Sequence, residues 1–151
     1  MKQNSLQYIT SLVEVLKSKG ENFKPLNQKK INNLQKKYDI ILPKAYIEFL
    51  SVMGKGANRF MLGSSVFYPE LFELQEWGKE LAEENNISEF PKNAFIFWMH
   101  QGYQMAYFLL DSSPNPTVYY FSEINTEWKR VNSFTKFLEQ QLIFSGLKSN
   151  K

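Results

Sequence analysis

Hydrophobic positions recur at spacings of three and four along the first third of the chain, which predicts amphipathic helices with one buried face. The first helix covers about 6–19 and ends at Gly20, a residue that readily adopts the left-handed conformation of a helix end. Asn27 can cap a second helix, and Pro43 suits the first turn of a third, which Gly54 ends. Three helices are therefore expected before the first strand.

A short hairpin and a fourth helix are expected in the middle of the chain. The runs 60–62 and 66–68 favour strands, and the turn-forming residues 63–65 separate them. After Pro69 the apolar residues return to helical spacing at Leu71, Leu74, Trp77 and Leu81. The opposite face of this fourth helix is acidic, with Glu73, Glu76, Glu80, Glu83 and Glu84.

The strongest hairpin pattern in the chain lies at 94–100 and 103–110, two aromatic-rich runs joined across Gln101 and Gly102. Both faces of each run are largely apolar. We therefore expect this hairpin either to be covered on both sides or to present an aromatic surface to a partner. Two further strands at 117–121 and 128–131 and a last helix capped by Ser133 complete the predicted elements.

Length and composition fit one folded domain. A chain of 151 residues can bury one sizeable core, and 43% hydrophobic with 22% charged residues is ordinary for a globular protein. The prediction is a single α+β domain over 1–151, with its core at about 27–145. A mostly antiparallel sheet of about five or six strands would be flanked by helices.

Cysteine is absent, so the chain has neither disulfides nor thiol chemistry, which favours a cytoplasmic location. The first residues are polar, the next apolar positions are spaced as in a helix, and no apolar run approaches the roughly 20 residues needed to span a bilayer. We therefore expect no secretory leader and no membrane partner.

The residues offer little chemistry for catalysis. His100 is the only histidine, no serine or acid stands at a recognisable triad spacing, and one histidine without cysteine cannot supply a zinc site. Gly54-Lys55-Gly56 follows a helix rather than a strand and lacks the ending of a phosphate loop. The sequence predicts no enzyme, no cofactor and no metal, although a hydrolase with a concealed site remains an alternative.

Charge leaves one further alternative open. The net charge is +3, and four lysines crowd the second predicted helix at Lys29, Lys30, Lys36 and Lys37. These lysines could contact the phosphates of a nucleic acid. Because they are not interleaved with exposed aromatic residues, and an acidic helix follows in the same domain, a solvated helix flank is favoured and nucleic acid is disfavoured.

Short motifs resemble a known family. They are Leu42-Pro43, Tyr46, Phe49-Leu50 and a glycine turn at 54–56, followed by Ser133-Phe134 and Phe137-Leu138. Over about 31–142 the chain resembles the SUKH superfamily, in particular its Smi/Knr-like branch. The family's usual Asn-Gly-Gly is replaced here by Gly54-Lys55-Gly56 after Met53, which reshapes the turn.

This resemblance implies an α+β fold and a role in binding other proteins. In bacteria such proteins commonly act as immunity proteins that bind and neutralise a cognate polymorphic toxin, whereas fungal relatives act as regulatory scaffolds. The partner is therefore expected to be a cognate toxin domain or another protein. The slight positive charge argues against a basic nuclease as the toxin, unless the acidic helix makes the contact.

Three regions are expected to contact the partner. The residues are Lys55, Asn58 and Arg59 in the loop after the third helix, Trp98, His100, Gln101 and Tyr103 at the aromatic hairpin, and Glu73 and Glu80 on the acidic helix. The tryptophans Trp77, Trp98 and Trp128 are expected mainly in the core. Any tryptophan left on the surface would be a strong interface anchor.

Overall fold

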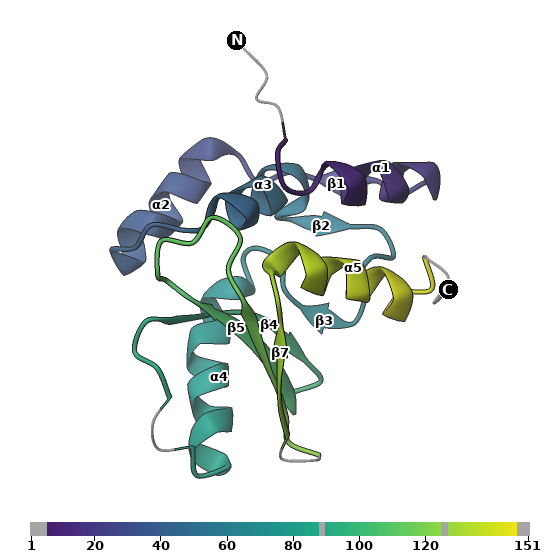
Figure 1. The fold of residues 1–151 in the computed structure, drawn as a ribbon. Coiled ribbons are helices and arrows are strands. Elements are labelled where there is room, and N and C mark those ends of the chain that lie inside the picture. The colour runs from purple at the N-terminus through teal and green to yellow at the C-terminus, as the bar shows by residue number, and fades with distance from the viewer. Residues whose placement is uncertain (1–5, 88–89, 125–126, 148–151) are drawn as a thin grey trace.

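A computed structural model describes residues 6–87, 90–124 and 127–147 of the chain (Figure 1). It confirms an α+β fold with helices and a predominantly antiparallel sheet. Among the described residues no helix is long and apolar enough to cross a membrane. The elements are α1 (Thr10–Ser18), β1 (Phe23–Lys24), α2 (Gln28–Tyr38), α3 (Lys44–Met53), β2 (Gly56–Ala57), β3 (Ser64–Ser65), α4 (Leu71–Glu84), β4 (Ala94–His100), β5 (Gln104–Leu109), β6 (Val118–Ser122), β7 (Glu127–Val131) and α5 (Phe134–Phe144).

The main sheet has five strands in the order β3-β4-β5-β6-β7, and every neighbouring pair is antiparallel. The helix α4 lies along one face of this sheet, while α3 and α5 lie on the other (Figure 1). On the α4 side, Gly78 provides the space for the Ile96 side chain. The Gln75 side chain accepts from the Ile96 N–H (3.1 Å) and donates to the Ile96 carbonyl (2.7 Å). It thus provides hydrogen-bond partners for the backbone of β4 beyond the residues that pair with β3.

A β-bulge in β4 decides which side chains face α5. The register pairs Ile96 with Tyr107 but Trp98 with Ala106, so Phe97 is an extra residue. In an unbroken strand Trp98 would share the face of Ile96, toward α4. Instead Phe97 and Trp98 both contact Phe137 of α5, with ring centroids 5.2 and 5.5 Å apart. The bulge therefore turns the end of β4 toward α5.

The centre of the core is a cluster of aromatic rings around Tyr46 of α3. Its ring lies 5.5 Å from that of Phe95, 5.3 Å from that of Phe108 and 5.5 Å from that of Phe134. Tyr46 is fully buried, burial raises the pKa of its hydroxyl, and no hydrogen-bond partner for that hydroxyl exists among the described residues.

Replacing Tyr46 by phenylalanine should stabilise the protein, because the change removes a buried hydroxyl that has no partner. We expect the free energy of unfolding to rise by about 1 kcal/mol in urea denaturation. Tyr38→Phe is the matched control, because the Tyr38 hydroxyl donates to the Phe72 carbonyl (3.4 Å), and this change should give no gain. A lower stability of Tyr46→Phe than of the wild type would contradict the expectation.

Local signals in the sequence placed most helix ends correctly. The side chains of Asn27 and Ser133 accept from the backbone N–H three residues on, as helix caps do. Gly20 has a φ of 79° just beyond α1. The start of α1 was predicted too early, because the Glu48 carboxylate of α3 accepts the N–H groups of residues 7–9 and keeps them out of the helix.

The predicted hairpin of 60–62 and 66–68 is wrong. The strand in this region is β3 at 64–65, within the expected turn, and it pairs with the end of β4. Phe60 and Val66 are buried singly in the core rather than paired with each other. Residues 64–65 thus pair with the edge of β4 instead of forming the turn of a local hairpin. The short sheet of β1 and β2 was not predicted, because strands of two residues carry no periodic pattern.

Candidate functional site

A cavity of about 740 Å³ lies on the side of the sheet that α5 covers, between α5 and the segment 59–64. We call it the α5 groove. Its floor comes from β4, β5, β6 and β7, one wall from α5, and the other from the segment 59–64. The lining residues are Arg59, Met61, Leu62, Ser64, Trp98, His100, Tyr103, Gln104, Tyr120, Lys129, Val131, Phe137, Gln140, Gln141, Phe144 and Ser145.

Aromatic side chains form the deep part of the groove. The rings of Trp98 and His100 are stacked, with centroids 5.9 Å apart and an angle of 7° between their planes. Trp98 also contacts Tyr120, and only 4% of its surface is exposed. Its indole N–H has no hydrogen-bond partner among the described residues. A buried donor without an acceptor costs stability.

Two apolar side chains stand exposed at the rim of the groove. Leu62 is 76% exposed and Phe144 is 79% exposed, and both line the cavity. Polar side chains of Tyr103, Gln104 and Gln140 lie in the same lining. An aromatic floor, apolar rim residues and hydrogen-bonding groups are the composition of a protein-binding surface.

Among the groove residues, His100 and Ser64 are the pair whose side chains are of the types used in catalysis. The Ser64 Oγ lies 3.1 Å from His100 Nδ1. A serine nucleophile needs a base that a third group orients, usually a carboxylate. No carboxylate hydrogen-bonds to His100 among the described residues. The pair is therefore arranged to hold the imidazole against Trp98 and to join β3 to β4, and the hydrolase alternative gains no support from it.

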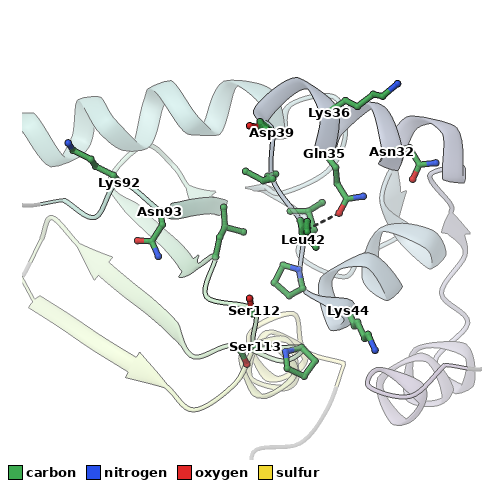
Figure 2. Close-up of a pocket in the computed structure, with 15 residues that line it drawn as sticks. Asn32, Gln35, Lys36, Asp39, Leu42, Lys44, Lys92, Asn93, Ser112 and Ser113 are labelled. Atoms are coloured by element: carbon green, nitrogen blue, oxygen red, sulfur yellow. Dashed lines mark hydrogen bonds between the residues drawn. The ribbon is translucent and has the colours of Figure 1, made fainter.

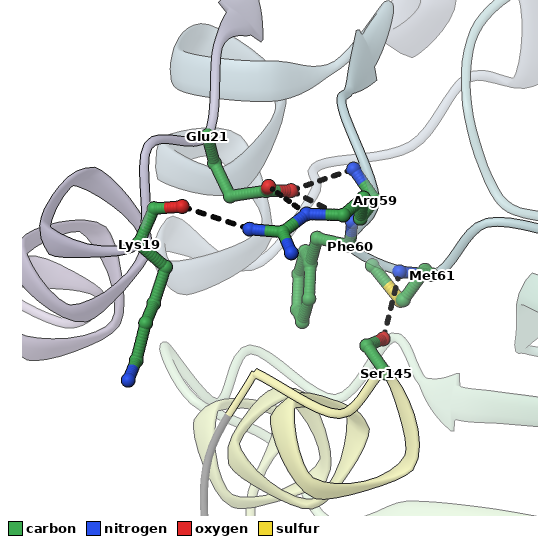
Figure 3. A network of polar contacts seen from close by, with 6 residues as sticks. All are labelled: Lys19, Glu21, Arg59, Phe60, Met61 and Ser145. Carbon is green, nitrogen blue, oxygen red and sulfur yellow. Dashed lines mark hydrogen bonds and ion pairs between the residues drawn. The ribbon is translucent and has the colours of Figure 1, made fainter.

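An ion pair between the exposed Arg59 and the buried Glu21 fixes this wall of the groove (Figure 3). The Glu21 side chain is fully buried and accepts from Arg59 Nε (2.9 Å) and from the backbone N–H groups of Arg59 (2.6 Å) and Phe60 (2.9 Å). Arg59 Nη2 also donates to the Lys19 carbonyl (2.8 Å). Ser145 Oγ accepts the Met61 N–H (3.1 Å), which ties this wall to the end of α5.

Burial acts to raise the pKa of Glu21, but the hydrogen bonds and charge of Arg59 and the N–H of Phe60 outweigh it and hold the pKa below its usual value. The ionised carboxylate is thus the form that the fold stabilises. Sequence reasoning missed Glu21, because its partners lie 38 and 39 positions away and no local pattern marks it.

Acid should remove the contribution of Glu21. A lowered folded-state pKa means that the stabilisation is fully present above the usual value of about 4.5 and is lost as the pH falls through the folded pKa. Glu21→Gln, which cannot ionise, should cost about 2 kcal/mol near neutral pH in urea unfolding. We expect this cost to shrink as the pH is lowered to about 3. A cost that stays constant with pH would contradict this account, and Glu14→Gln on the exposed face of α1 is the control.

The structure brings four of the predicted contact residues together. Arg59, Trp98, His100 and Tyr103 all line the α5 groove. The other five are not among its lining residues. Lys55 and Asn58 are exposed on the loop around β2, Glu73 is exposed on α4, and Gln101 and Glu80 line a separate cavity of about 380 Å³ on the α4 side.

Several groove residues were not predicted, in particular Leu62, Gln140 and Phe144. The sequence does carry a signal for Phe144, because this residue falls outside the inward-packing stripe of Phe134, Phe137, Leu138 and Leu142. An apolar residue outside the buried stripe of a helix is expected on the surface. Of the tryptophans, Trp98 is buried, Trp77 is half-buried, and Trp128 is 42% exposed while its ring contacts Tyr107 and Phe121. Trp128 does not line the α5 groove.

Comparison with known proteins gives one match. The model of the SMI1 / KNR4 family (SUKH-1) matches residues 25–140, which run from the end of β1 into α5. No curated protein and no solved structure matches the chain. In the part of the chain that the structure describes, no group of His, Asp or Glu side chains is arranged to hold a metal ion.

Proposed function

The chain belongs to the SMI1 / KNR4 family (SUKH-1), and on that premise we propose that it is an immunity protein that neutralises a cognate toxin domain in the cytoplasm by binding it directly. Membership of this family is consistent with such a role. The protein would act by occupying the surface of its partner, with no chemistry of its own.

The α5 groove is the observation that carries this proposal. Its apolar rim residues Leu62 and Phe144 stand in water although an aromatic floor lies beside them. Burying each of them against a partner would gain roughly 1.5–3 kcal/mol. The ion pair of Glu21 with Arg59 and the bond from Met61 to Ser145 hold the walls in place before binding. A preformed site loses little conformational freedom when the partner arrives.

The charges of the groove indicate the kind of toxin surface that fits it. Arg59 and Lys129 are the charged residues in its lining, and no carboxylate is among the lining residues. With no carboxylate in its lining and with Arg59 already paired to Glu21, the groove offers no acidic group to a basic nuclease. The acidic outer face of α4, with Glu73 and Glu80, belongs to the opposite side of the sheet.

Co-expression tests the proposal. A toxin domain found among the neighbouring genes should kill or arrest cells when expressed alone, and co-expression of this protein should restore growth. Leu62→Asp and Phe144→Asp should each weaken binding to the purified toxin domain at least tenfold, about 1.4 kcal/mol, because they place a charge where an apolar contact is expected.

Ile124→Asp is the matched control for these variants. Ile124 is 72% exposed and lies outside the α5 groove, so the same change there should leave binding intact. Failure of the wild-type protein to restore growth would contradict the immunity role. Rescue with equal loss of binding in all three variants would contradict the assignment of the groove.

A further inference from the structure

A second cavity, of about 900 Å³, lies on a different part of the surface, and we call it the lysine groove (Figure 2). It is enclosed by the end of α2, the link to α3, the segment around Asn93, and the loop after β5. No residue lines both this groove and the α5 groove. It is therefore a separate candidate binding surface.

Hydrogen bonds between the enclosing segments hold the lysine groove in shape. Gln35 Oε1 of α2 accepts the Leu42 N–H (2.8 Å), drawn as the dashed line in Figure 2. The Ala45 N–H in the first turn of α3 donates to the Pro114 carbonyl (2.8 Å). The Leu110 N–H donates to the Asn93 carbonyl (2.9 Å). The walls are thus joined to one another, and a ligand would meet a preformed surface.

The charge of this groove is predominantly positive. Lys36, Lys44 and Lys92 stand around it on three different segments, and all three are exposed (Figure 2). Asp39 is the one carboxylate among its lining residues. Among the described residues none forms an ion pair with these lysines. Their charges are therefore available to a partner.

An exposed apolar side chain also lines this groove. Ile41 lines the groove and is 87% exposed, the most exposed large hydrophobic residue in the described part of the chain. Its backbone is fixed on both sides, because the Ile40 N–H donates to the Gln35 carbonyl (3.0 Å) and the Leu42 N–H is bonded as above. Asn32 and Asn93 add amide groups that can pair with a peptide backbone.

We propose that the lysine groove binds an acidic segment of a partner protein, in which an apolar residue that packs on Ile41 is flanked by carboxylates that meet Lys36, Lys44 and Lys92. Charge complementarity would select the segment, and the apolar contact would add affinity. This inference goes beyond the proposed function, because it concerns a surface that does not overlap the α5 groove.

The composition of the groove favours a protein segment over a nucleic acid. Single-stranded nucleic acids bind by stacking on aromatic side chains, and no aromatic residue lines this groove. Two neighbouring lysines of α2 are engaged elsewhere, with Lys30 over the ring of Tyr68 and Lys37 over that of Phe72.

Titration of the ¹⁵N-labelled protein with a synthetic peptide, followed by NMR, tests this inference. The peptide carries a central leucine flanked by glutamates on both sides, and a second peptide carries glutamine in place of each glutamate. We expect the acidic peptide to shift the amide signals of residues 36–44, 92–93 and 110–114, with an affinity that falls as salt is added. The glutamine peptide should bind at least tenfold more weakly.

Variants and a third ligand complete the test. The triple variant Lys36→Glu, Lys44→Glu, Lys92→Glu should abolish the shifts, and Ile41→Ser should weaken binding several-fold. The matched control Lys17→Glu, Lys29→Glu, Lys79→Glu changes the net charge equally at exposed positions outside the groove and should bind as the wild type does. The inference would be overturned if no shifts appeared, if both peptides bound equally, or if both triple variants lost binding equally. Tighter binding of a single-stranded oligonucleotide at the same residues would also overturn it. The toxin-domain assay is independent of all these outcomes.

Discussion

Phe134→Ala is expected to lower the free energy of unfolding by about 3–5 kcal/mol, the range for removing a large buried side chain that leaves a cavity. Phe134 is fully buried at the start of α5, and its ring contacts Tyr46 and Phe49 of α3 and Phe97 of β4 at centroid distances of 5.2–5.8 Å. It therefore joins α5 to both α3 and the sheet. Because domains are typically stable by only about 5–15 kcal/mol, this loss is a large part of the total.

Chemical denaturation of purified protein measures this loss directly. Phe144→Ala is the matched control, since it makes the same change in the same helix at a side chain that is 79% exposed. We expect it to change stability by less than about 0.5 kcal/mol. Comparable losses in the two variants would mean that the ring cluster around Phe134 does not hold α5 in place.

Gly54→Ala is expected to cost about 3 kcal/mol, at the upper end of the usual range for overpacking. Gly54 has an ordinary helical φ of −61°, so its backbone angles do not require glycine. An added Cβ would lie 2.6 Å from the Leu50 carbonyl oxygen and 2.7 Å from the Leu26 Cβ. That carbonyl accepts from both the Gly54 and Leu26 N–H groups, so it cannot retreat without breaking two hydrogen bonds.

Gly20→Ala is the matched comparison for Gly54→Ala, because it makes the same change at a position with open space around it. Gly20 has a φ of 79° and open space around it, so alanine there incurs only the backbone strain of roughly 1–2 kcal/mol. Urea denaturation should therefore rank Gly54→Ala as the more harmful change. The reverse order would show that α3 and the segment before α2 can separate slightly to admit a methyl group.

The sequence predicted the elements that are long and strongly periodic. The aromatic hairpin became β4 and β5, and the helix after Pro69 became α4 at 71–84. Capping residues such as Asn27 and Ser133 act within three positions of themselves and were identified for that reason. The strand β3 was missed because its pairing with β4 joins residues 36 and 34 positions apart, beyond the reach of a local pattern.

Of the residues that line the α5 groove, the sequence singled out only Arg59, Trp98, His100 and Tyr103. Trp98 and His100 were selected because they stand at the end of an aromatic strand. Simple alternation would place them on the opposite face of β4 from Phe95 and Phe97. The bulge at Phe97 instead brings Phe97 and Trp98 into contact with the same helix, α5. No sequence pattern marks that extra residue. The wall of the groove rests on Glu21 with Arg59, a contact between distant segments.

Hydrogen–deuterium exchange with a toxin domain that this protein neutralises in co-expression tests most directly whether the protein binds its partner through the α5 groove. Amide exchange is compared for the free protein and the complex. Protection is expected at 59–64, 98–104 and 137–145, the segments that carry most of the groove's lining residues, with α4 unchanged. Protection confined to α4, or no protection at a toxin concentration that saturates binding, would contradict it.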